Sequence, residues 1–152
     1  MGLRLGIPLA LVFLLGCSVT AKLYPVQTNS TIHQSTPSQP LIAKMEFFGL
    51  GKSGTISIVL ANGETCRGPY SFVEQYPKVL DRNILSSAWD SVYGPGYFVA
   101  HVLGTNHAIT ELTGDQGSKV LIDFYRTPGE THNSQILGVA SENKTGLYKV
   151  VF

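Results

Sequence analysis

Cys17 is the residue whose type and setting offer the clearest chemistry in this chain. It follows Leu14-Leu15-Gly16 at the end of an apolar segment. A peptidase that cuts before residue 17 must approach the backbone closely, which the small Gly16 allows. A thiol is also the one side chain in this segment that can accept a diacylglyceryl group. We therefore expect cleavage before Cys17 and attachment of lipid to its sulfur.

The segment before Cys17 has the features of an export signal. Arg4 supplies a positive charge, and Leu5 to Leu15 supply a largely apolar run within the roughly 7 to 15 residues of a secretory signal. A helix that spans a bilayer needs roughly 17 to 25 residues. Residues 1–16 are therefore predicted to be a signal peptide, and the alternative to lipid attachment is an ordinary signal peptide followed by a chance cysteine. Myristoylation of Gly2 is disfavoured, because Gly6 stands where that signal has Ser or Thr.

The order Leu, aliphatic residue, Gly, Cys resembles the lipobox of bacterial lipoproteins, although Leu15 is bulkier than the usual occupant of its position. The resemblance implies two or three acyl chains on Cys17. One acyl chain binds a membrane only marginally, so several would make attachment effectively permanent. In Gram-negative lipoproteins an Asp after the cysteine typically retains the protein in the inner membrane. Ser18 at that place implies the outer membrane, on its periplasmic face.

Charge and cysteine content exclude other classes. Removing residues 1–16 removes Arg4 alone among the charged residues, which leaves ten basic and ten acidic residues. A neutral chain argues against nucleic acid as a partner and against electrostatic adhesion to anionic lipid. With Cys17 acylated, Cys66 has no partner within the chain. It is expected to be a small buried hydrophobe, or else to form an intermolecular disulfide.

The residues that follow Cys17 are predicted to form a spacer. Ser18 to Pro40 are rich in Ser, Thr, Gln, Asn and Pro, and so bury too little apolar surface to offset the entropy of ordering. We expect a flexible tether over residues 17–40, which would span roughly 25 to 30 Å. Its apolar patch, Leu23-Tyr24-Pro25-Val26, either docks on a surface or is passive. A single β-domain is expected over residues 41–152.

Strand patterns begin after the predicted tether. Gly54 to Leu60 alternate in polarity, and Ala61-Asn62-Gly63-Glu64 is a strong hairpin signal. A two-residue loop would pair Val59 with Cys66, whereas a three-residue loop with Gly63 as a bulge would pair Ile58 with Cys66. We favour the second register, because it buries the thiol and keeps Arg67 off the apolar face.

One helix is expected between Glu74 and Gly96, since apolar residues recur there at helical spacing. Ser87 and Asp90 form a possible capping box, and Gly94-Pro95 can end the helix. Trp89 fits a core position better than a platform for a ligand.

The remaining chain is predicted to return to strands separated by turns. The expected strands are Tyr97 to Leu103, His107 to Leu112, Lys119 to Tyr125, Ile136 to Ala140 and Tyr148 to Phe152. The fold class is therefore mainly β: a small antiparallel β-barrel or sandwich of about 7 to 8 strands with one short helix. A barrel inserted in the membrane is disfavoured, because its strands would need roughly 9 to 11 residues each.

A second resemblance covers most of residues 41–152. The segments that carry it are Gly54 to Leu60, Gly63 to Cys66, Ala88-Trp89-Asp90, Tyr93 to Tyr97 and Gly146-Leu147-Tyr148. They resemble small Gram-negative lipoproteins that have no assigned activity. These motifs are structural in type, so no functional residue is carried over.

No catalytic constellation emerges from the titratable residues. The candidates weighed are His101, His107, Asp90, Glu111 and Asp123. Their spacing gives neither the nucleophile, base and orienting group of a hydrolase nor the three or four ligands of a zinc site. We expect no catalytic residue, no metal and no cofactor.

Two classes of function remain. The first is a structural or interaction module of the cell envelope, which offers an exposed strand edge or the aromatic group Trp89, Tyr93, Tyr97 and Phe98 to an envelope protein. The second is a carrier whose barrel or sandwich holds a small apolar ligand. A wide apolar cavity would favour the carrier, and an interior filled by side chains would disfavour it.

Overall fold

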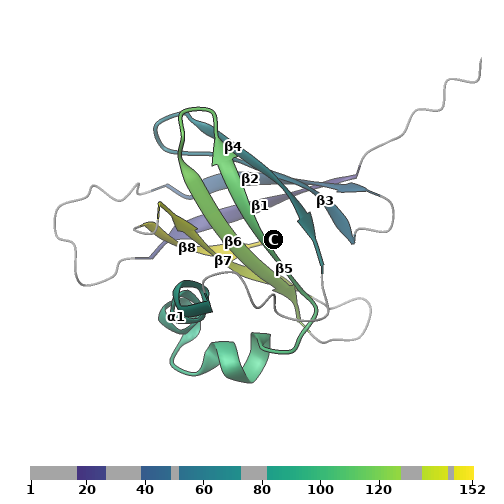
Figure 1. The fold of residues 1–152 in the computed structure, drawn as a ribbon, viewed down its shortest axis with the longest axis vertical. Helices are drawn as coiled ribbons and strands as arrows, with labels where there is room; N and C mark the ends of the chain where they lie inside the picture. Colours follow the sequence, from purple (N-terminus) through teal and green to yellow (C-terminus); the bar gives the residue numbers. More distant parts are fainter. Residues whose placement is uncertain (1–16, 27–38, 49–51, 73–81, 128–134, 144–145) are drawn as a thin grey trace, which may run out of the picture.

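The computed structural model describes residues 17–26, 39–48, 52–72, 82–127, 135–143 and 146–152. Eight antiparallel strands form a closed barrel in which each strand pairs with its neighbours in the chain, and β1 pairs with β8 (Figure 1). The predicted class, a small antiparallel β-barrel with one short α-helix, is confirmed. The predicted signal peptide, residues 1–16, lies outside the described residues.

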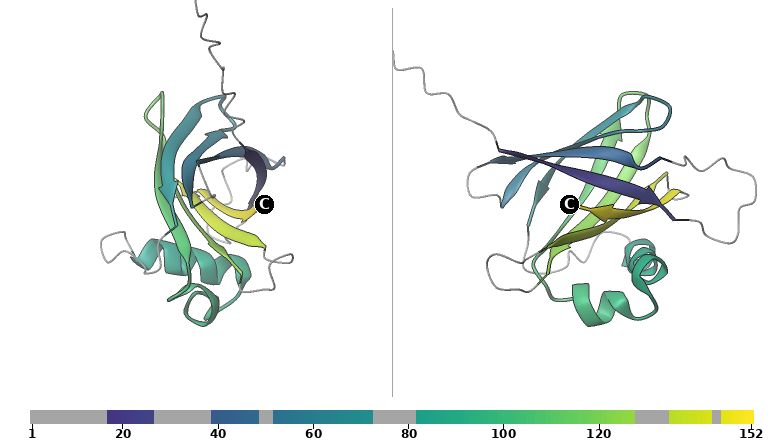
Figure 2. Two further views of the ribbon diagram at one scale, coloured as in Figure 1. Left: turned by 90° about the vertical axis from the view of Figure 1, so that its right-hand side faces the viewer. Right: turned by 180° about the vertical axis from the view of Figure 1, so that it is seen from behind.

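Short strands build the barrel wall. They are β1 (Ser18–Pro25), β2 (Leu41–Phe48), β3 (Ser53–Val59), β4 (Thr65–Ser71), β5 (His107–Gly114), β6 (Lys119–Arg126), β7 (Ile136–Glu142) and β8 (Gly146–Val151). The connection from β4 to β5 carries α1 (Arg82–Tyr93) and a short π-helix, η1 (Phe98–Val102). Figure 2 shows both helices outside the barrel, where α1 packs on β7 and β8.

The predicted tether is wrong for its first part, because Ser18–Pro25 form β1. Ala21 and Leu23 point into the barrel and are fully buried, whereas Lys22 and Tyr24 between them are exposed. Two buried positions suffice here because the partners β2 and β8 supply the backbone hydrogen bonds. The β-domain therefore begins at Ser18 and not at residue 41. Residues 27–38 of the predicted tether are outside the described part.

The predicted strand Tyr97 to Leu103 is also wrong. Phe98 and Val102 are buried four residues apart in η1, and a short apolar run of this kind fits a helix as well as a strand. The predicted capping box is wrong too, because Ser87 and Asp90 lie inside α1. The Asp90 carboxylate instead accepts a hydrogen bond from the backbone N–H of Phe98, which joins η1 to α1.

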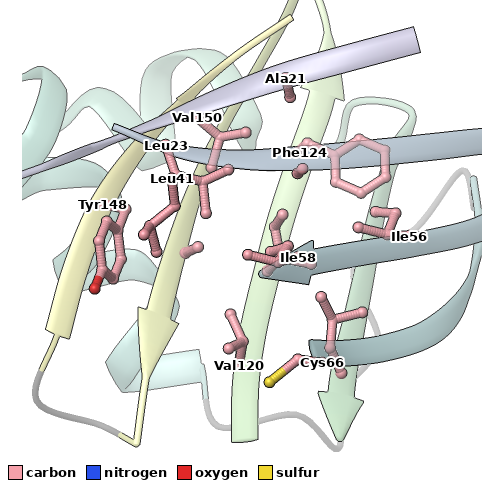
Figure 3. Close-up of a cluster of buried hydrophobic side chains, with 14 of the residues drawn as sticks. Ala21, Leu23, Leu41, Ile56, Ile58, Cys66, Val120, Phe124, Tyr148 and Val150 are labelled. Carbon is pink, nitrogen blue, oxygen red and sulfur yellow. The ribbon is translucent and has the colours of Figure 1, made fainter. Parts of the chain in front are cut away.

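The interior of the barrel holds the main core. Figure 3 shows side chains from β1, β2, β3, β4, β6 and β8 converging inside it. Ile58 pairs with Cys66, so the preferred register of the β3–β4 hairpin is confirmed. Gly63 has the positive φ that this turn requires. Cys66 is fully buried, as its interpretation as a small hydrophobe predicts.

A second core lies between the barrel wall and the helices. Its buried members are Leu85, Ala88, Trp89, Phe98, Val102, Tyr125 and Val139. Strand β6 serves both cores: Ile122 and Phe124 point into the barrel, and Tyr125 faces the helices. The prediction that Trp89 occupies a core position is confirmed.

Glu64 closes one end of the barrel, which we call the hairpin end. Its carboxylate is 1% exposed and accepts hydrogen bonds from the backbone N–H groups of Gln116 and Ser118, both at 2.9 Å. The Ser118 hydroxyl donates a further bond of 2.6 Å. These bonds tie the β3–β4 turn to the β5–β6 turn and satisfy a charge that would otherwise be costly to bury.

Replacing Glu64 with Gln is expected to lower the midpoint of thermal unfolding at pH 7, since an amide cannot accept all of these bonds. The hydrogen bonds from Ser118 lower the pKa of Glu64 below its usual 4.5. The stabilisation is therefore complete above that value and is lost as the pH falls through the lowered pKa. Circular dichroism melts should show the gap between the native protein and E64Q closing as the pH falls below 4.5.

Glu111→Gln is the matched control. Glu111 forms an exposed ion pair with Lys119 at 2.8 Å, and such pairs contribute less than about 1 kcal/mol. A loss in E111Q as large as that in E64Q would contradict the special role of Glu64.

Candidate functional site

Cys17 lies exposed at the end of the barrel opposite Glu64. Its carbonyl oxygen accepts a hydrogen bond of 3.0 Å from the backbone N–H of Phe47, near the end of β2. Strand β1 begins at the next residue. The predicted attachment residue is therefore fixed to the folded domain.

The wall of the barrel is uneven at this end. Ser18 to Ala21 pair with β2, whereas pairing between β1 and β8 starts only at Lys22, opposite Val151. The start of β1 thus extends beyond the end of β8, next to which the C label stands in Figure 1. In the described residues, Ser18 to Ala21 therefore pair with β2 on one side and have no ladder partner in β8 on the other.

Aromatic side chains gather at the Cys17 end, which we call the aromatic end. Partly buried apolar residues that pack on the interior core are Phe47, Phe72, Ile136 and Phe152, and all four lie at this end of their strands. Tyr70 and Phe124 lie just inside, and their ring centroids are 5.5 Å apart. Edge-to-face contacts join Phe72 to both of these rings, at 6.1 Å and 5.3 Å. Such contacts favour a defined arrangement of the rings.

The hydroxyl of Tyr70 is an unusual feature of this end. Tyr70 is 4% exposed, and its hydroxyl oxygen has no hydrogen-bond partner in the described structure. Burial raises the pKa of this phenol above its usual 10, so the group stays protonated at neutral pH. A buried hydroxyl without a partner costs free energy unless a bound group supplies one.

The aromatic group predicted as an interaction surface is largely internal. Trp89 and Phe98 are buried, at 0% and 5% exposure, so their assignment to an exposed surface is wrong. Tyr93 and Tyr97 are half-buried and stack on each other with centroids 4.8 Å apart. The Tyr93 hydroxyl donates to the carbonyl oxygen of Gly138 on β7 at 3.3 Å, and the Tyr97 hydroxyl lies 2.9 Å from that of Tyr125 on β6, so both rings pack on the outside of the barrel wall.

His107 and Asp123 meet beneath α1. The Trp89 indole donates a 2.8 Å hydrogen bond to Asp123 Oδ2, and His107 Nδ1 lies 3.7 Å from Asp123 Oδ1. Burial raises the pKa of Asp123 to about 7, partly offset by the Trp89 bond, and burial lowers the pKa of His107. Both side chains have zero exposure, so a substrate in solution cannot touch them.

The other candidate residues are scattered. Asp90 bonds to the backbone of η1, Glu111 pairs with Lys119, and His101 is exposed with its ring on Tyr97. No group of three or more His, Cys, Asp or Glu suited to a metal ion occurs in the segments that the structure describes. Within those segments, no helix is both long and apolar enough to cross a membrane.

Comparisons with protein-family models, curated proteins and solved structures give no match. The class of this protein therefore follows from its own fold. It is a small up-and-down β-barrel with neighbouring strands paired in chain order and a helical layer on one outer face.

Sequence reasoning predicted a role for Cys17 and did not predict the aromatic end. The available signal was that Phe47, Tyr70, Phe72 and Phe124 all fall within three residues of a strand end. Their convergence depends on strand order and direction, which the sequence pattern left open.

Replacing Asp123 with Asn is expected to change the pH dependence of stability. The pKa of Asp123 rises from 3.8 to about 7 on folding, so the native protein should lose stability as the pH rises through this window. The Asn oxygen still accepts the Trp89 bond, but Asn carries no charge. Urea unfolding followed by Trp89 fluorescence should show that the free energy of unfolding of D123N increases relative to that of the native protein between pH 5 and pH 8.

Because His107 Nδ1 lies 3.7 Å from Asp123 Oδ1, the two groups titrate as a coupled pair, and the comparison reports the loss of the Asp123 charge together with its effect on His107. Asp115→Asn, at an exposed turn, is the matched control. A stability gap between the native protein and D123N that is the same at both pH values would contradict the burial of a titrating carboxyl group.

Proposed function

We propose that this protein is a lipid-anchored, non-catalytic lipoprotein of the cell envelope, held at the outer membrane and facing the periplasm. The observation that carries the proposal is the position of Cys17. It is exposed immediately before the first strand, and the segment before it has the pattern of an export signal. Cleavage there would remove no part of the barrel.

The two cysteines differ in access. Cys66 is fully buried in the interior, and burial is the main cause that raises the pKa of its thiol. A modifying enzyme needs an accessible sulfur, and reactive thiols are partly exposed ones. Lipid attachment is therefore assigned to Cys17 alone.

A non-catalytic role is supported by where the titratable residues lie. The one close His and Asp pair in the described part is sealed beneath α1, and its partner Trp89 is a core residue. Catalysis needs such groups at a place that substrate can reach. The proposed role of the barrel is to contact a membrane or an envelope protein.

Replacing Cys17 with Ser should release the protein from membranes into the soluble fraction, because serine offers no thiol for the lipid. Fractionation of cells and partitioning into detergent would measure the release. Mass spectrometry of the native protein should show a mass increase of two or three acyl chains with glycerol on residue 17.

Cys66→Ala is the matched control, since it removes the other thiol and should leave the protein on the membrane. Unchanged partitioning of C17S, or an unmodified residue 17 in the native protein, would overturn the proposal.

Transport of a small apolar ligand is the second candidate, favoured by the Tyr70 hydroxyl among the rings of the aromatic end. An eight-stranded barrel is wide enough either to be filled by side chains or to hold one small ligand. The packing of Phe124 and Tyr70 against each other favours a filled interior.

Titration with a fluorescent fatty acid distinguishes the two candidates. A carrier should bind the probe saturably at one site, and Tyr70→Phe should weaken a ligand whose polar group meets the hydroxyl. Absence of saturable binding would remove the carrier and leave the anchored module.

A further inference from the structure

We infer that the lipidated protein lies with the aromatic end of its barrel directly against the lipid surface, and does not stand off on a spacer. This inference rests on the proposed lipid attachment at Cys17. It specifies which face of the molecule meets the membrane and therefore which end faces the periplasm.

The first argument is that no unpaired residue separates Cys17 from the first strand of the barrel. The Cys17 carbonyl is bonded to Phe47 N–H at 3.0 Å, and Ser18 is already paired with Glu46 of β2. Only the side chain of Cys17 separates the barrel from the attached lipid. With several acyl chains in the bilayer, this end must lie at the membrane surface.

The second argument is the apolar surface at the same end. The partly exposed residues of the interior core, Phe47, Phe72, Ile136 and Phe152, are all at the aromatic end. Val19, two residues after the anchor, is 38% exposed. Clustered apolar side chains next to a lipid anchor are suited to the interface of a bilayer.

Two basic residues at the aromatic end also favour contact with anionic lipid. Exposed Lys52 and Arg126 lie at the aromatic end, where bacterial membranes would present anionic headgroups. Glu46, close to this end, is balanced by Lys44 at 2.9 Å and Arg67 at 3.6 Å. Among the described residues, the hairpin end carries Asp115 and Glu142 at its turns, buried Glu64, and exposed Lys119, which pairs with Glu111.

Other exposed apolar residues compete for the membrane. Tyr24, Ile42 and Val59 lie toward the hairpin end of β1, β2 and β3 and are 42%, 48% and 53% exposed, so the label at residue 116 must report on that end. Val99 and Leu103 of the η1 region are 67% and 42% exposed. They belong to the helical region that Figure 2 shows outside the barrel wall. A test must therefore separate this layer from the aromatic end.

Spin labels on single cysteines can make this separation in the full lipidated protein. The background is Cys66→Ala, and the labels are placed at exposed positions with Ser71→Cys at the aromatic end, Gln116→Cys at the hairpin end and Ala100→Cys on η1. Lys52→Cys is a second reporter of the aromatic end should S71C fail to fold. Each variant is first checked for its acyl chains by mass spectrometry and for its fold by circular dichroism.

The lipidated variants are placed in vesicles of phosphatidylethanolamine and phosphatidylglycerol. Collisions of each label with oxygen, which enters lipid, and with a water-soluble nickel complex are then measured. The expected result is severalfold lower access of nickel to the label at residue 71 than in the same variant carrying Cys17→Ser, with increased access of oxygen. Labels at residues 116 and 100 should show equal nickel access in both forms.

Three other outcomes are possible, and each contradicts either the orientation or the lipid attachment. Acylated protein in which the label at 71 stays fully accessible to nickel overturns the orientation and leaves the anchor intact. Protection at residue 100 in place of residue 71 overturns it in favour of the helical layer. Absence of acyl chains on residue 17 overturns the proposed function, and the orientation falls with it.

Discussion

The pairing of β1 between β2 and β8 is the interaction on which the rest of the structure depends. It closes the sheet, so that Leu23 and Val150 can share one interior. Without β1, two strand edges would expose unpaired backbone groups, which is a liability for any soluble sheet. The same pairing fixes Cys17 to the rim. Closure of the barrel and the placement of the proposed anchor are therefore one structural event.

The barrel wall carries apolar residues on both faces where the helices cover it. On β6, Ile122 and Phe124 fill the interior, and Tyr125 packs under Trp89 with ring centroids 5.5 Å apart. This double burial explains why Asp123 is inaccessible although it lies on the outer face of the barrel. Its contact with Trp89 joins the helical layer to the wall and has the features of a structural polar contact.

The two ends of the barrel have opposite chemistry. At the hairpin end, a buried carboxylate and its hydrogen bonds from Gln116 and Ser118 seal the interior. At the aromatic end, rings of intermediate exposure meet the surface beside Cys17. The hairpin end also bears exposed Ile42 and Val59 on its strands, so the difference between the ends lies in what closes the interior: a hydrogen-bonded carboxylate at one end and aromatic rings at the other. The proposed function and the proposed orientation both use this asymmetry.

The sequence by itself determined the β3–β4 register and the mainly β class, because these depend on local composition and on period-two alternation, and it carries the pattern on which the proposed lipid attachment at Cys17 rests. It did not determine that Ser18–Pro25 form a strand or that Phe98–Val102 form a helix. Only the tertiary structure decided these, since β1 needs two partner strands and η1 needs a wall to pack on. The tertiary structure also decided the aromatic end, because this end brings together residues from strands that are far apart in the chain.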